Sequence, residues 1–177
     1  MRRKVDRNRL EKFMRALAEH ANRPAKVFFT GGTTAVQEGW RDATIDVDIQ
    51  IVPETDEILR AIPALKERLQ INIEFASPPH FIPEVPGWEE RSTFIVQEGF
   101  LSFYHYDFHA QALSKIERSH ERDIADVKEM LLRGLVQPNR LKELFALIEP
   151  NLYRFPAIHP PSFRRKLESL LSEVGRG

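Results

Sequence analysis

The sequence predicts an α/β fold in which strands and helices alternate first and helices alone follow. Three observations lead to this prediction. Residues 7–21 carry apolar side chains at helical spacing, which is typical of a helix packed on a core. Residues 44–49 and 69–75 alternate between apolar and polar side chains, as strands with one buried face do. Beyond the last strand the spacing is helical only, so we expect an α/β domain over residues 1–107 and a helical region over 108–177.

Glycine and proline mark the boundaries of the first elements. An apolar run over residues 25–29 predicts the first strand. Two glycines follow it and predict a turn into a short helix, which Thr33 and Thr34 can cap. The next strand spans residues 43–52 and stops at Pro53. The glycine turn therefore lies between the first two strands of the predicted sheet.

The middle of the chain predicts a helix, a loop and a hairpin. Apolar residues over 58–69 have helical spacing, and Pro63 inside this stretch predicts a break or kink. Residues 76–88 are rich in proline and predict a loop. Two apolar stretches, 93–96 and 101–106, predict a hairpin that extends the sheet.

Helical patterns fill the remainder of the chain. Asp107 and Ser119 are placed to cap the first two of these helices. The predicted helices span residues 110–116, 118–132, 138–148 and 163–174.

Composition limits the possible classes of protein. The 26 basic and 26 acidic residues balance, so net charge indicates nothing for or against nucleic-acid binding, although residues 1–9 and 164–166 are locally basic. The absence of cysteine excludes disulfides, thiolate metal sites and cysteine nucleophiles. No apolar run of about 18 residues and no secretory signal pattern occur, so we expect a soluble cytoplasmic protein.

Two carboxylates lie on one face of the strand over residues 44–49. Asp46 and Asp48 are two residues apart, which in a strand separates their Cα atoms by about 7 Å. Carboxylate oxygens are the ligands that Mg²⁺ prefers. This spacing is therefore suited to shared binding of one divalent cation.

A Gly-Gly turn, a short helix and an Asp-x-Asp strand, in this order, resemble the nucleotidyltransferase fold of the DNA polymerase β superfamily. Within it, the chain is most similar to the minimal nucleotidyltransferases of prokaryotes and to the abortive-infection type II toxin nucleotidyltransferases. Arg41 and Thr44 match the arginine and threonine that precede the two aspartates there. Glu74 matches a third carboxylate on a neighbouring strand. The resemblance implies a palm with a mixed, mainly antiparallel sheet.

A second group of charged residues follows the predicted sheet. In the toxin-type relatives a helical lysine is followed by Arg-Asp-x-x-Asp, and Lys115, Arg122, Asp123 and Asp126 match this pattern. The resemblance implies that Lys115 and Arg122 stabilise the leaving pyrophosphate, while Asp123 orients the lysine or closes the site. The alternative is a charged helix surface, with an ion pair between Arg122 and Asp126 one turn apart.

The function that the resemblance implies is Mg²⁺-dependent transfer of a nucleoside monophosphate from a nucleoside triphosphate. The acceptor would be a hydroxyl of RNA, such as a tRNA end, or of a protein, and the chain could be a toxin with an antitoxin partner. Asp46, Asp48 and Glu74 would hold the metal, and Lys115 completes the expected catalytic set. The expected nucleotide-binding residues are Gly31, Gly32, Thr33, Arg41, Thr44, Arg122, Asp123 and Asp126.

Two other classes of function remain open from the sequence. One is a degenerate module of the same fold that binds a nucleotide or a partner without chemistry. The other is a phosphate-transferring or hydrolytic enzyme that uses the same metal site.

Overall fold

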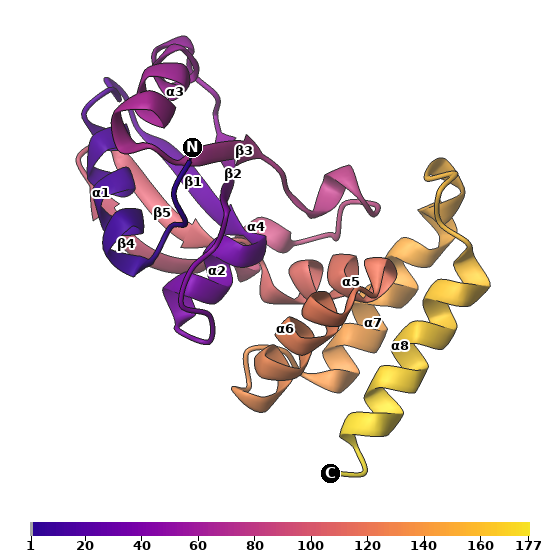
Figure 1. The fold of residues 1–177 in the computed structure, drawn as a ribbon. Helices are drawn as coiled ribbons and strands as arrows, with labels where there is room; N and C mark the ends of the chain where they lie inside the picture. Colours follow the sequence, from indigo (N-terminus) through magenta and orange to yellow (C-terminus); the bar gives the residue numbers. More distant parts are fainter. Residues whose placement is uncertain (1) are drawn as a thin grey trace. The chain divides into compact units, whose positions relative to one another are not determined.

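A computed structural model describes residues 2–177, which form two compact units. The first unit extends to Ser77 and resumes over Ser92–Tyr106, and it contains the sheet (Figure 1). The second unit comprises Pro78–Arg91 and Asp107–Gly177 and is helical. The proline-rich residues after Ser77 therefore group with the helices, although they lie between strands in the sequence.

The first unit combines three helices with five strands. Its elements are α1 (Arg7–Ala18), β1 (Ala25–Thr30), α2 (Gly31–Glu38), β2 (Asp46–Val52), α3 (Asp56–Leu69), β3 (Asn72–Phe75), β4 (Thr93–Glu98) and β5 (Leu101–His105). The strand order is β3-β2-β1-β5-β4. β1 pairs antiparallel with β2 and parallel with β5, while β2–β3 is parallel and β4–β5 antiparallel. The predicted α/β fold with a mixed sheet is confirmed, with half of the pairings antiparallel.

The alternating pattern of β2 separates a buried face from a polar one. Val47, Ile49 and Ile51 are buried in one cluster with apolar residues of α1 and α3. Because successive side chains of a strand point to opposite faces, Asp46 and Asp48 lie on the other face of the sheet. The burial of alternate apolar residues does not extend to the residue before β2, since Ile45 is 60% exposed.

The structure differs from two local predictions for the first unit. α3 continues through Pro63, so the predicted break does not occur there; burial of apolar residues such as Ile58 and Ile62 offsets the loss of the hydrogen bond that the proline cannot donate. Thr33 and Thr34 do not cap α2, because the helix already begins at Gly31 and both hydroxyls bond elsewhere. The N-cap residue is Thr30, which makes no side-chain capping bond.

The second unit consists of helices joined by short turns. Its elements are η1 (Pro78–His80), α4 (Trp88–Arg91), α5 (Phe108–Arg118), α6 (Glu121–Leu132), α7 (Pro138–Ile148), η2 (Glu149–Arg154) and α8 (Pro160–Val174). α7 and α8 pack through Phe145 and Phe163, whose ring centroids are 4.9 Å apart. Within residues 2–177, no helix is both long enough and apolar enough to span a membrane.

One of the two helix caps predicted for the second unit is confirmed, and the other is wrong. Asp107 caps α5 as predicted, since its Oδ1 accepts a hydrogen bond from the His109 backbone N at 3.1 Å. Ser119 does not cap α6. It ends α5 instead with a left-handed φ of 58°, and His120 occupies the N-cap of α6. The chain therefore turns within two residues between these helices.

Asp107 also anchors Arg91 inside the second unit. Its Oδ2 accepts hydrogen bonds from Arg91 Nε at 3.0 Å and Nη2 at 2.8 Å, and its side chain is 1% exposed. Burial raises the pKa of Asp107, but the hydrogen bonds from His109 and Arg91 and the charge of Arg91 outweigh this effect. The pKa of Asp107 therefore lies below its usual range.

Replacing Asp107 by Asn should destabilise the protein by about 2 kcal/mol at pH 7, because the arginine loses a charged acceptor while the helix cap is kept. A carboxylate with a lowered pKa contributes its full stability above its ordinary pKa of about 4. That contribution is lost as pH falls through the lower pKa of the folded protein. Urea denaturation should therefore show the difference from wild type at pH 7 and a smaller difference below about pH 4. The exposed Asp42→Asn is the matched control, and a constant difference at all pH values would contradict the prediction.

Candidate active site

The two glycines after β1 form the start of α2, and they allow β2 and the loop before β2 to approach this helix closely. Gly31 has a φ of +59°, which favours glycine. A Cβ atom at Gly31 would lie 2.7 Å from Asp48 Oδ2. A Cβ atom at Gly32 would lie 2.4 Å from Thr44 Oγ1 and 2.8 Å from Arg41 Nη1. The structure thus brings together five of the residues that the sequence predicts for the site.

Thr33 fixes the position of β2 relative to α2. Its side chain is fully buried, and its Oγ1 accepts a hydrogen bond from the Asp48 backbone N at 2.9 Å. The same hydroxyl donates to the Asp46 carbonyl at 3.4 Å. Because the hydroxyl is used in this way, any contact of Thr33 with a phosphate has to come from its backbone N–H.

The carboxylates lie together on the polar face of β2 and β3. In the parallel register Asp46 lies opposite Asn72 and Asp48 lies opposite Glu74. Asn72 Nδ2 donates to Asp46 Oδ1 at 2.6 Å and to Glu74 Oε1 at 3.0 Å. One amide therefore connects two of the three predicted carboxylates.

Asn72 is a site residue that sequence reasoning missed. The signal was available, since Asn72 precedes Glu74 by two residues and strand alternation puts both side chains on one face. Its amide donates to two oxygens that would otherwise repel each other. We infer that it holds Asp46 and Glu74 in place.

The donor set agrees with the chemistry of Mg²⁺. Among residues 2–177, no group of three or more His, Cys, Asp or Glu side chains is arranged to hold a metal ion by itself. Mg²⁺ is usually bound by one or two carboxylates together with substrate phosphates, and not by a complete protein cage. Asp46 and Asp48, with their oxygen ligands on one strand face, fit this mode of binding.

The second predicted group lies in the second unit. Lys115 is 4% exposed, and its Nζ lies 2.8 Å from Asp126 Oδ2 and 3.6 Å from Asp123 Oδ1. Asp123 also accepts from Arg118 Nη2 at 3.0 Å. Arg122 is exposed on α6. The ion pair predicted between Arg122 and Asp126 is replaced by a buried pair that joins α5 to α6.

His105, at the end of β5, makes two polar contacts with α2. Its ring is 2% exposed, with Nε2 2.9 Å from Glu38 Oε1 and Nδ1 3.2 Å from Thr34 Oγ1. Thr34 Oγ1 in turn donates to the Phe29 carbonyl at 3.1 Å. These contacts attach α2 to β1 and β5, and so support the glycine turn from the side of the helix.

Replacing Gly31 by Ala should cost more stability than replacing Gly39 by Ala. Both glycines have positive φ, at +59° and +94°, but a Cβ at Gly39 meets no atom within 4 Å. We expect a loss of about 1 kcal/mol for Gly39→Ala from backbone strain alone, and a larger loss for Gly31→Ala because the Asp48 carboxylate must move. Urea denaturation measures both.

A double-mutant cycle tests the cause of this difference. Combining Gly31→Ala with Asp48→Ala removes the obstructing carboxylate, so the cost of the glycine substitution should fall to that of Gly39→Ala. An unchanged cost in the Asp48→Ala background would mean that the carboxylate is not the obstruction.

Comparison with known proteins gives one family. A family model described as a nucleotidyltransferase of unknown function (DUF6036) matches residues 8–156. No curated protein and no solved structure matches the chain. The matched residues contain the glycine turn, the carboxylates and the charged pair of α5 and α6. The chain therefore belongs to this family of nucleotidyltransferases of unknown function (DUF6036).

Proposed function

We propose that this protein transfers a nucleoside monophosphate from a nucleoside triphosphate to an acceptor hydroxyl, with Mg²⁺ as the metal. The observation that carries the proposal is the common face of Asp46, Asp48 and Glu74 beside the glycine turn. Three carboxylates and a glycine-rich helix start are the parts that metal-assisted transfer from a triphosphate needs. Membership in a nucleotidyltransferase family supports the same reaction.

The residues of the first unit have distinct proposed roles. Asp46 and Asp48 would hold the metal that accompanies the triphosphate, together with phosphate oxygens, and Glu74 would complete the metal site. The backbone N–H groups of Gly31, Gly32 and Thr33 bind phosphate oxygens at the start of α2. Arg41 and Thr44, which lie next to Gly32, contact the same phosphates in this proposal. When bound, Mg²⁺ would neutralise phosphate charge and lower the pKa of the attacking hydroxyl.

The reaction exchanges one phosphorus–oxygen bond for another. The acceptor oxygen forms a bond to the α-phosphorus, and the bond from that phosphorus to the bridging oxygen breaks. Pyrophosphate leaves with its bonding electrons, and the hydroxyl proton goes to solvent. The proposed acceptor is RNA, such as a tRNA end, or a protein side chain, and a role as a toxin controlled by an antitoxin belongs to the same proposal.

The proposed role of Lys115 and Arg122 rests on the resemblance. Lys115 is already neutralised by Asp123 and Asp126 in the second unit, whereas Arg122 is exposed. Stabilisation of pyrophosphate by these two residues stays a prediction. If the Lys115→Met variant folds and retains nucleotidyl transfer, this lysine has a structural role.

A binding module without chemistry is the second candidate. The observation in its favour is the amide of Asn72, which occupies one oxygen of Asp46 and one of Glu74. Nucleotide binding that depends on Mg²⁺ but releases no pyrophosphate would support it.

Replacing Asp46 by Asn should reduce transfer at least about 100-fold, because one metal ligand loses its charge. The assay incubates the protein with each α-labelled nucleoside triphosphate, Mg²⁺ and total cellular RNA and protein, followed by gel separation. Label in an RNA band or a protein band identifies the class of acceptor.

The control is Asp42→Asn, which makes the same chemical change at an exposed position four residues earlier. It should retain full transfer, and both variants should show the thermal denaturation of wild type. Equal transfer by Asp46→Asn and wild type would overturn the proposed metal site. If the wild-type protein labels no RNA or protein band but calorimetry detects nucleotide binding, the binding module is favoured.

A further inference from the structure

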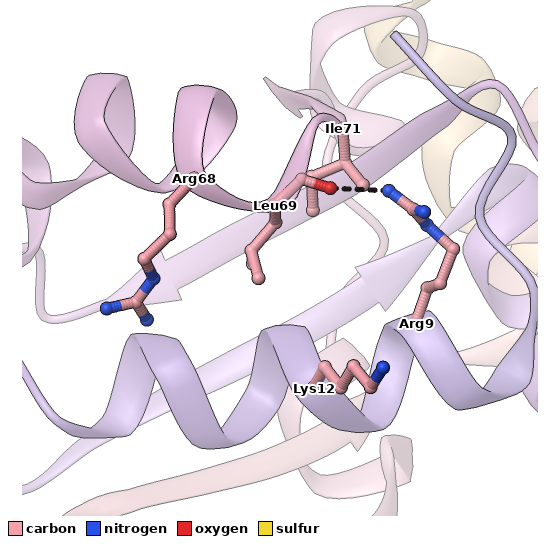
Figure 2. A pocket seen from close by; sticks show the side chains of 5 residues that line it. All are labelled: Arg9, Lys12, Arg68, Leu69 and Ile71. Atoms are coloured by element: carbon pink, nitrogen blue, oxygen red, sulfur yellow. Dashed lines mark hydrogen bonds between the residues drawn. The ribbon is translucent and has the colours of Figure 1, made fainter.

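A basic pocket lies between α1 and the end of α3 in the first unit. It has a volume of about 190 Å³ and is shown in Figure 2. Three cationic and two apolar residues line it, namely Arg9, Lys12, Arg68, Leu69 and Ile71. Because α1 and α3 pack on the apolar face of β2, this pocket lies on the opposite side of the sheet from Asp46 and Asp48. It is therefore separate from the candidate active site.

The pocket carries an excess of positive charge. Arg9 and Lys12 extend from α1, while Arg68 extends from the end of α3 toward it, so the cations come from two sides (Figure 2). Arg68 Nη2 lies 3.5 Å from Glu19 Oε2, but both side chains are largely exposed, and an exposed ion pair of this kind contributes little to the stability of the fold. Glu67, at the same end of α3, pairs with Arg2, whose Nη2 lies 2.6 Å from Glu67 Oε1.

Arg9 is held in place with part of its hydrogen-bonding capacity unused. Its Nη2 donates to the Leu69 carbonyl and, at 3.3 Å, to the Gln70 carbonyl, which fixes the guanidinium at the end of α3. Its Nε is buried and has no hydrogen-bond partner among the residues that the structure describes. The positive charge of the guanidinium attracts an anion in the pocket, whereas the buried Nε itself is closed off from solvent.

We propose that this pocket binds a phosphate group of a nucleic-acid strand. The guanidinium groups of Arg9 and Arg68 recognise phosphate through directed N–H groups, and Lys12 adds a point charge without fixed geometry. The partly exposed Leu69 provides an apolar surface for a sugar. The volume is below the roughly 300 Å³ of pockets that enclose whole small ligands, which favours one phosphate with its sugar over a complete nucleotide. This inference goes beyond the proposed transfer reaction and does not depend on it.

The test measures RNA binding by the full chain without nucleotide or Mg²⁺. Fluorescence anisotropy of a labelled single-stranded RNA is followed from about 50 to 200 mM salt. The variant is Lys12→Gln/Arg68→Gln, because Arg9 also supports α3. The control is Arg60→Gln/Lys142→Gln, which removes the same charge at exposed positions outside the pocket.

We expect the pocket variant to bind RNA about tenfold more weakly, and the control to stay within about twofold of wild type. The slope of log affinity against log salt should become shallower by about 0.7, since the proposed pocket holds one phosphate and each single-strand phosphate contact contributes about 0.7. Unchanged binding in the pocket variant, or equal weakening in the control, would overturn the proposal.

A second arm distinguishes the source of the phosphate. Inorganic phosphate is titrated while NMR follows the backbone amides of residues 9–12 and 68–71. Shifts that disappear in the pocket variant, with RNA binding unaffected, would keep a phosphate site and overturn its assignment to nucleic acid. Repeating the RNA measurement in the Asp46→Asn background separates this result from the transfer reaction, because binding should be unchanged there.

Discussion

The contact between the start of α2 and β2 is the constraint on which the candidate active site depends. The Thr33 hydroxyl binds the backbone on both sides of Val47, and Gly31 leaves room for the Asp48 carboxylate against the helix. β2 then determines where β3 lies through the parallel register, and β3 carries Glu74. A small change at this contact would therefore move all three carboxylates together.

The parts of the fold that follow from local pattern were predictable from the sequence. Alternation around Asp46 and Asp48 identifies the strand and its polar face, because a strand with one buried side has a period of two. The order β3-β2-β1-β5-β4 was not available in this way, since pairing between distant strands leaves no local signal. Pro63 shows the limit of propensity, because burial of the neighbouring apolar residues keeps α3 continuous.

Side-chain partners were harder to predict than elements. Thr33 has the residue type of a helix cap, yet its hydroxyl binds the backbone of strand β2, and nothing in the adjacent sequence indicates this partner. Lys115 and Asp126 are 11 residues apart on different helices, so the ion pair between them depends on how α5 and α6 pack. The helical spacing of Arg122 and Asp126 favoured a different pair, which the structure does not form. Long-range packing, which a single sequence does not encode locally, decides such contacts.

The ion pair between Arg91 and Asp107 has a consequence for how the chain can be divided. These two residues belong to the second unit and flank the segment that contributes β4 and β5 to the sheet of the first unit. The hairpin is therefore an insertion whose two ends are held together at 2.8 Å by the unit from which it departs. No single cut in the polypeptide separates the two units, because the chain passes between them after Ser77, after Arg91 and after Tyr106. A fragment that ends at Ser77 lacks two of the five strands, and one that begins at Pro78 carries a hairpin without its sheet.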